Sequence, residues 1–466
     1  MTTSDTVTGA TGAAGATATT SAPLSLNQEF VCVFDQGDDG GPFGPRYHLV
    51  HGWRVRGGVD EETLRGALAD VVVRHEALRT LIVRRDGSRH QEILPPCPVE
   101  LEVRDLSGTA PERRDAVVDD LLDEVEASTI ESGTLPHLRA VLGRFDDQDA
   151  ILVIITHHTA TDGWSMRLII RDVARYYAAR REGVPAALPE TRPYREYAQW
   201  QLASAQEGGA EADHAYWREN LRGAEIFTVR TDRPRSAEAG QETSVHRFLI
   251  GAETISRATA LAKTVRGTLF MVLLSAFYLL EHRETGRTDI TVPTFTPGRG
   301  RERDGFGDMV GSCFNFLPLR TDLAACRTFR QVVERTRTTC LEGYSHDIPT
   351  LRIFGQAPEL MRPAMEADRA PWVFQVFPFP FVLDGEVIGD LEYTEVRLRL
   401  LDQSVGSDVP DGALWTLNLH PTGEIVGSVQ YKNALYDHDT IAGLVAEYGR
   451  LLTEAVAAPG APLPRD

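Results

Sequence analysis

The period of the hydrophobic pattern changes near residue 160. Residues 150–156 (AILVIIT) are all apolar or β-branched, which predicts a strand buried on both faces. Residues 165–182 follow with apolar side chains at helical spacing, and Ser165 is suited to cap the start of that helix. The pattern therefore places residues 157–163 in a strand-to-helix loop, where a rigid scaffold presents reactive side chains.

Further helices and strands are predicted on both sides of this loop. Helical periodicity covers residues 60–73, 111–127 and 268–281, and strand-like runs cover 289–297, 415–419 and 427–433. Residues 1–21 are mostly Thr, Ala, Gly and Ser, which predicts a disordered tail. The polar stretch 206–212 is a candidate boundary. We therefore predict an α/β protein with an N-terminal half at 22–205 and a C-terminal half at 213–460.

Composition and charge exclude several classes of protein. The 466 residues carry a net charge of −19, which argues against binding to nucleic acid or to an anionic membrane. The five cysteines are scattered without a CxxC pair, so neither a disulfide framework nor a zinc site is expected. No charged signal-peptide region is present, and the apolar run 269–280 is too short to span a bilayer. We expect a cytoplasmic protein.

The loop itself reads His157-His158-Thr159-Ala160-Thr161-Asp162-Gly163. Adjacent side chains at a strand end point in opposite directions, so one imidazole is expected to be buried and the other to face a cleft. Histidine moves protons near neutral pH, which favours acid–base chemistry. The alternatives are two purely structural histidines, or a metal site. No HExxH or carboxylate–histidine motif accompanies the pair, so no metal ligand is predicted.

The HHxxxDG pattern resembles the condensation-domain superfamily, which includes nonribosomal peptide synthetase condensation domains and chloramphenicol-acetyltransferase-like (CAT-like) enzymes. Other stretches resemble further signatures of that family, in the family's order, over about residues 23–455. They are residues 25–30 (SLNQEF), 74–80 (RHEALRT), 192–200 (RPYREYAQW), 310–318 (VGSCFNFLP), 345–349 (SHDIP) and 368–371 (DRAP). The fifth of these lacks the family's Gln, and the last is degenerate.

The resemblance implies two CAT-like halves in a V-shaped pseudo-dimer, with the histidine loop at their junction. It implies a floor loop near residues 297–306 and a segment of the second half that crosses to the first, which we place at 401–416. His158 would act as general base or position the nucleophile, and Gly163 would offer a backbone amide to the oxyanion. The supporting residues expected are His157, Asp162, Arg299 as the partner of Asp162, and Arg79. Substrate contacts are expected from Trp164, Ser165 and Asn315.

The activity implied is condensation. A carrier-bound (amino)acyl thioester would be transferred to a hydroxyl or amine acceptor, giving an ester or amide in a natural-product pathway, with an enediyne-type pathway as one candidate. The partners would be a peptidyl carrier protein, whose phosphopantetheine holds the donor, and a small-molecule nucleophile; no bound cofactor is expected. The carrier would dock on Arg171, Arg175, Arg180 and Arg181, or on Arg330, Arg335 and Arg337. No carrier segment is found, so a free-standing enzyme is expected.

Three other functions remain open. An epimerase of a carrier-bound aminoacyl group would share the histidine loop. A CoA-dependent acyltransferase of the same superfamily is a second alternative, although the DFGWG signature of one branch is absent. A docking module that kept the fold without catalysis is the third.

Overall fold

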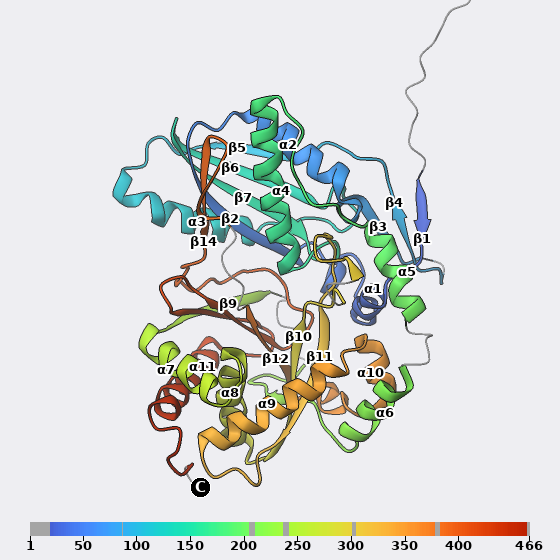
Figure 1. Ribbon diagram of the computed structural model, residues 1–466, viewed down its shortest axis with the longest axis vertical. Helices are drawn as coiled ribbons and strands as arrows, with labels where there is room; N and C mark the ends of the chain where they lie inside the picture. Colours follow the sequence, from blue (N-terminus) through green and yellow to red (C-terminus); the bar gives the residue numbers. More distant parts are fainter. Residues whose placement is uncertain are drawn as a thin grey trace, which may run out of the picture.

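Two α/β halves stack along the long axis of the molecule (Figure 1). The computed structural model describes residues 19–85, 87–204, 210–235, 242–300, 304–377 and 383–463. No single helix among these residues is long and apolar enough to cross a membrane. Helices α7 (Ala252–Thr264) and α8 (Leu269–Thr285) reach that length and composition only as a pair, which is bent by 106°.

The N-terminal half is built on a six-stranded sheet in the order β13-β14-β2-β7-β6-β5. Its strands are β2 (His48–Arg56), β5 (Glu100–Asp105), β6 (Leu138–Asp146), β7 (Asp149–His157), β13 (Asp384–Ile388) and β14 (Leu391–Val396). Every residue of β7 is buried, as the apolar run predicted. Leu152 and Ile154 pack in one core cluster with α2 (Glu61–Arg74) and α4 (Gly163–Glu182), whereas Ile151 and Val153 pack in another with α3 (Arg114–Glu126).

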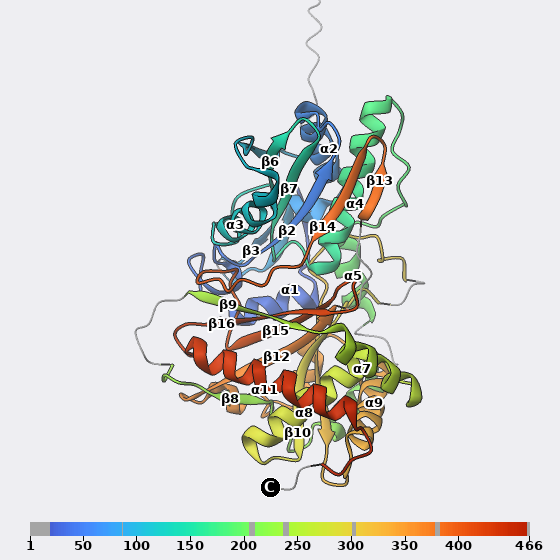
Figure 2. The same cartoon turned by 90° about the vertical axis from the view of Figure 1, so that its left-hand side faces the viewer.

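One edge of this sheet comes from the distant hairpin β13–β14. Strand β14 pairs antiparallel with β2, from Glu392 opposite Arg56 to Val396 opposite Gly52, and the hairpin lies beside β2 in Figure 2. The segment that crosses into the N-terminal sheet is therefore the hairpin and not the predicted 401–416, although Gln403 Nε2 donates to the Asp123 carbonyl and the Asp408 N–H donates to the Arg46 carbonyl. By Gln403 the chain pairs with Val245 of the C-terminal half. The exposed edge of β2 needs a partner strand, and β14 supplies one with alternating burial.

The C-terminal half contains a five-stranded sheet in the order β8-β12-β15-β16-β9 and a separate pair, β10-β11. The strands are β8 (Thr228–Arg230), β9 (Thr243–Ile250), β10 (Asp289–Thr296), β11 (Asn315–Asp322), β12 (Arg369–Phe377), β15 (Ala413–Leu419) and β16 (Ile425–Lys432). The further helices are α6 (Ala210–Asn220), α9 (Phe329–Ser345), α10 (Thr350–Gln356) and α11 (His438–Ala457). The predicted helix at 268–281 and strands at 289–297, 415–419 and 427–433 are confirmed to within a few residues.

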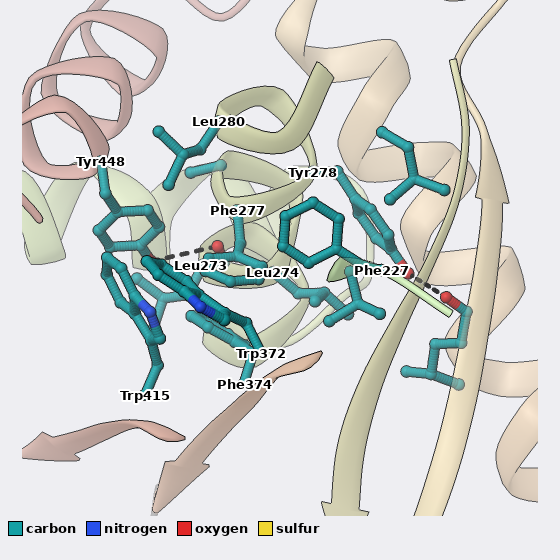
Figure 3. Close-up of a cluster of buried hydrophobic side chains, with 14 of the residues drawn as sticks. Phe227, Leu273, Leu274, Phe277, Tyr278, Leu280, Trp372, Phe374, Trp415 and Tyr448 are labelled. Atoms are coloured by element: carbon teal, nitrogen blue, oxygen red, sulfur yellow. Dashed lines mark hydrogen bonds between the residues drawn. The ribbon is translucent and has the colours of Figure 1, made fainter. Parts of the chain in front are cut away.

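Aromatic side chains fill the core between the five-stranded sheet and its helices (Figure 3). The ring centroids of Phe277 on α8 and Phe374 on β12 lie 4.6 Å apart, and Trp415 packs 5.3 Å from Phe277. The Tyr448 hydroxyl donates a hydrogen bond to the Leu273 carbonyl at 3.2 Å, so its polar end is satisfied inside the core. This rigid half forms one wall of the junction.

The first described residues already form structure. Strand β1 (Thr20–Ala22) pairs with β4 (His90–Ile93), which also pairs with β3 (Thr80–Val83). The predicted disordered tail is therefore wrong for residues 20 and 21, and residues 1–18 lie outside the described residues. The predicted boundary at 206–212 also lies partly outside them. The short 3-10 helices are η1 (Cys32–Phe34), η2 (Gly41–Phe43), η3 (Glu76–Arg79), η4 (Pro111–Arg113) and η6 (Arg362–Met365).

The Ser and Gln of the segment 25–30 form a capping box at the start of α1 (Leu26–Val31). The Ser25 backbone N–H donates to Gln28 Oε1 at 2.9 Å, and the Gln28 N–H donates to Ser25 Oγ at 3.0 Å. Ser25 Oγ also bonds to the Tyr194 hydroxyl on α5 (Tyr194–Ser204) at 2.8 Å. The first signature thus fixes α1 against α5 beside the junction.

Candidate active site

His157, the last residue of β7, is completely buried and serves as a structural residue. Its Nε2–H donates to the Gly44 carbonyl at 3.2 Å, and its Nδ1 accepts from the Thr159 hydroxyl at 2.7 Å. Burial, followed by the neighbouring His137, holds the pKa of His157 well below its ordinary value. The ring is therefore neutral and locked at both nitrogens.

His158 points the other way and lines a cavity between the halves. Its Nδ1–H donates to the Thr161 carbonyl at 2.7 Å, because a carbonyl can only accept. Burial lowers the pKa of His158, so the neutral ring keeps Nε2 as a free acceptor in this tautomer. The imidazole stacks on Tyr47 with centroids 4.8 Å apart and meets the Phe314 ring at 5.6 Å. The two rings and the carbonyl fix the direction of Nε2.

Asp162 joins the two halves through a bidentate ion pair with Arg299. Arg299 Nη1 donates to Asp162 Oδ2 at 2.8 Å, and Nη2 donates to Oδ1 at 2.9 Å. The carboxylate also accepts from the Cys313 N–H at 3.0 Å and from the N–H and Oγ–H of Ser165, each at 2.8 Å. Burial works to raise the pKa of Asp162, but the Arg299 guanidinium holds it below its usual value. The predicted contact between Asp162 and Arg299 is confirmed.

Helix α4 begins at Gly163, which lines the same cavity as His158, and Asp162 rather than Ser165 is its N-cap. The Ser165 N–H is bonded to Asp162, whereas the first N–H groups of a helix have no partner within the helix. The N–H groups of Gly163 and Trp164 are therefore the candidate donors to an oxyanion, and the positive end of the helix dipole adds to them. The oxyanion role of Gly163 stays a prediction.

The cavity at the junction has a volume of about 890 Å³ and draws its walls from both halves. The N-terminal half contributes His158, Gly163 and Trp164, and the C-terminal half contributes a mixed wall that contains an aromatic group. That wall includes Phe270, Phe295, Phe314, Phe316, Phe354 and Phe377. A cavity of this size accommodates a drug-sized molecule and suits an aromatic or apolar group close to His158.

Three predicted residues have other roles. Ser165 is completely buried, and its Oγ is used by Asp162, Gly311 and Arg299, so it supports the loop rather than substrate. Asn315 ties β11 to α10: its Oδ1 accepts from the Thr350 N–H at 2.9 Å. The hydrogen bonds of Arg79 go to the carbonyls of Val72 and Leu94, so it holds the α2–β4 region and not the histidine loop. These corrections share one cause, because polar side chains near a site are often consumed by backbone groups.

Comparison with known proteins agrees with this geometry. A family described as "Condensation domain" matches residues 19–465. The chain belongs to the condensation-domain family. Its fold is the family's pair of CAT-like α/β halves in a V, as the resemblance implied.

Several relatives resemble this condensation domain over most of its length. The SgcC5 protein of Streptomyces globisporus, solved in complex with (R)-(-)-1-(2-naphthyl)-1,2-ethanediol and sucrose, is 46% identical with a TM-score of 0.91, covering 95% of this chain and 100% of that one. The X-domain from teicoplanin biosynthesis is 25% identical with a TM-score of 0.77, covering 94% and 96%. The probable non-canonical nonribosomal peptide synthetase CymA of Salinispora arenicola is 33% identical over 458 residues, which are 95% of this chain but 6% of that protein.

The floor loop of this condensation domain is held by the aromatic residues of α5. The Tyr197 hydroxyl donates to the Gly298 carbonyl at 2.7 Å. Gly298 has a φ of +64°, and a Cβ there would lie 1.6 Å from the Cys313 carbonyl oxygen, so only glycine fits. Phe306 is buried against Tyr197 and Trp200. The aromatic side chains of residues 194–200 thus pack against the loop that carries Arg299. Residues 301–303 of this loop lie outside the described residues.

The sequence did not reveal the residues that orient His158. Tyr47 precedes β2, more than a hundred residues away from the motif, and its backbone carbonyl accepts the His158 N–H at 2.9 Å. Phe314 lies inside the segment 310–318, and its aromatic side chain was the only local sign that it packs against His158. His137, whose ring centroid is 5.7 Å from that of His157, follows a cis Leu135-Pro136 bond and has no motif around it.

Proposed function

We propose that this condensation domain is an acyltransferase that joins a carrier-bound (amino)acyl thioester to a hydroxyl or amine acceptor. The observation that carries the proposal is the neutral His158, whose Nδ1–H is held by Thr161 and whose Nε2 is left as an acceptor at the cavity. Nε2 would take the proton of the attacking group while the N–H groups at the start of α4 stabilise the oxyanion. As the oxyanion collapses, the C–S bond would break and Nε2 would return the proton to the departing thiolate. His157 and Asp162 would hold the loop.

A hydroxyl is the acceptor we favour. An alcohol is a weak nucleophile and gains more from a base than an amine does, because a neutral amine already carries a reactive lone pair. The aromatic wall of the cavity and the aryl diol bound by SgcC5, which is 46% identical, support an aryl-substituted alcohol. The enediyne-type pathway remains a prediction within this proposal.

The donor would arrive on the phosphopantetheine of a peptidyl carrier protein. In the first predicted docking cluster, Arg180 forms an ion pair with Asp70 at 2.6 Å. A helix rises 1.5 Å per residue, so Arg180 lies about 25 Å along α4 from Gly163. Arg175 is exposed and lies nearer to the cavity. The second cluster lies in the first half of α9, where Arg330 already bonds to the Thr264 hydroxyl and Arg337 to the Arg266 carbonyl. We therefore place the carrier near Arg175.

A product assay by mass spectrometry tests the proposal. Aminoacyl thioesters on a carrier, on a short pantetheine mimic and on CoA are mixed with the enzyme and with an aryl-1,2-diol or the matched aryl amino alcohol. His158→Ala should lower turnover by about a hundredfold or more, the usual contribution of acid–base catalysis. His90→Ala, a partly exposed histidine on β4, is the matched control and should keep turnover.

Each alternative function has its own signal in this assay. Deuterium exchange at Cα without coupling would identify an epimerase. Coupling from the CoA thioester alone would identify a CoA-dependent transferase. Carrier binding without any product across the acceptor panel would identify a docking module. Full turnover by a folded His158→Ala variant would remove the base role.

A further inference from the structure

A second group of ionisable side chains lies outside the cavity, where three distant segments meet. His246 is on β9, Asp402 is in the link between β14 and β15, and His438 is the first residue of α11. His246 Nδ1 lies 3.0 Å and His438 Nε2 lies 2.7 Å from the same atom, Asp402 Oδ2. The two imidazole centroids are 5.2 Å apart. Two nitrogens and one carboxylate oxygen therefore converge on one point.

We propose that His246, Asp402 and His438 form a binding site for a divalent transition-metal ion such as Zn²⁺. The three ligand atoms lie within 4.8 Å of one another. Tetrahedral Zn²⁺ with bonds of about 2.0–2.1 Å places its ligands roughly 3.3 Å apart. The contacts of His246 and His438 with Asp402 Oδ2, now 3.0 Å and 2.7 Å long, would therefore both open to about that separation as the metal enters between them. Imidazole and carboxylate are ligands that suit this class of metal.

The exposure of the three side chains leaves the ion a path and an open coordination position. The side chains of His246, Asp402 and His438 are 15%, 40% and 49% exposed. A site with three protein ligands keeps room for water, as open zinc sites do. The net charge of −19 also favours the approach of a cation.

Outer partners already orient two of the three ligands. The Arg247 backbone N–H donates to Asp402 Oδ1 at 2.8 Å, which leaves Oδ2 for the metal. His438 Nδ1 lies 3.5 Å from Asp439 Oδ1, the carboxylate–histidine arrangement that commonly supports a metal ligand. The guanidinium of Arg247 is turned away, toward the Leu401 carbonyl at 2.7 Å and the Gln403 side chain.

Metal binding here would tie down one wall of the cavity. The link that carries Asp402 also carries Arg399, which bonds to Glu126 of the N-terminal half at 2.9 Å and lines the cavity. An ion held by β9, the link and α11 would fasten this link to the C-terminal half. The three ligands lie outside the cavity lining, so metal binding does not depend on the proposed activity.

The test uses the tag-free chain of 466 residues after chelation and dialysis. Zn²⁺ is titrated by calorimetry, and Co²⁺ is titrated by visible absorption, whose bands report the ligand geometry. The variants are His438→Ala, His246→Ala and Asp402→Asn. His420→Ala, at the turn between β15 and β16, is the matched histidine control. Circular dichroism checks that each variant is folded; Asp402→Asn is nearly isosteric and keeps the test valid if a histidine variant misfolds.

The expected result is one equivalent of Zn²⁺ per chain, with at least tenfold weaker binding in each of the three variants and unchanged binding in the control. Zinc should also raise the melting temperature of the wild type and the control but not of the variants. The absence of one-to-one binding by the wild type would overturn the proposal. Equal binding by wild type and all three variants would overturn it as well.

Discussion

Replacing Asp162 with Asn should destabilise the junction between the halves far more than a surface charge change does. The ion pair with Arg299 is nearly inaccessible, with side chains 7% and 6% exposed. Asn keeps the shape of Asp but loses its charge. In either orientation of the new amide, its N–H₂ group faces N–H donors: those of Arg299, and also that of Ser165 or of Cys313. Breaking one partner of a buried pair costs about 3–5 kcal/mol, and we expect Asp162→Asn to fall in that range.

Urea unfolding at pH 7, followed by circular dichroism and by tryptophan fluorescence, measures this cost. The two signals must give coincident transitions, since a bipartite chain can unfold in steps. The double variant Asp162→Asn/Arg299→Met should lose at least about 2 kcal/mol less than the sum of the single variants, because it leaves no unpaired buried charge.

The pH dependence provides an internal check. The pKa of Asp162 is lower in the folded protein than in the unfolded chain. The ionised carboxylate therefore adds its full share to the free energy of unfolding above the unfolded pKa of about 3.9, and this share is lost as the pH falls through the pKa of the folded state. The difference between wild type and Asp162→Asn should therefore shrink in acid. A cost below about 1 kcal/mol at pH 7, or strictly additive single variants, would refute the reasoning.

Three further predictions concern the same junction. Because burial lowers the pKa of His158, the acid limb of the rate–pH profile should have its midpoint below 6.5, and a titration with an alcohol acceptor, which has no competing amine, measures it. Tyr47→Leu should lower kcat severalfold with little change in KM, because it removes the ring stacked on His158. Tyr47→Phe keeps the ring and should preserve kcat. Steady-state kinetics of both variants test this prediction. Gly298→Ala should cost at least about 2 kcal/mol, because its Cβ would overlap the Cys313 carbonyl at positive φ, and chemical denaturation would show a smaller loss if the loop can shift.

Local patterns were sufficient for the elements that carry the histidine loop. The uninterrupted apolar run at 150–156 is β7, because a central strand with α2 and α4 on one face and α3 on the other has no polar face. The helical spacing that follows is α4. The opposite directions of His157 and His158 also follow from the strand geometry alone.

Contacts made across long sequence separations were harder to predict. The resemblance to the family, and not the residue pattern, paired Asp162 with Arg299. Strand β14 is short and mixes polar with apolar residues, including the buried Glu395, so no local pattern assigns it to the sheet of the other half. Ser165 and Asn315 are polar residues beside the site, but only the structure shows that backbone groups already use them.

The hairpin β13–β14 determines how this protein can be divided. A fragment that ends at residue 204 would leave the backbone hydrogen-bonding groups along β2 open to solvent, a template for edge-to-edge aggregation. When halves are exchanged between condensation domains, residues 383–396 should therefore be moved together with the N-terminal half. These residues lie within the sequence of the C-terminal half. Conversely, a synthetic peptide of that segment should complete a truncated N-terminal half, so the hairpin is a point at which the protein can be split and reassembled from two pieces.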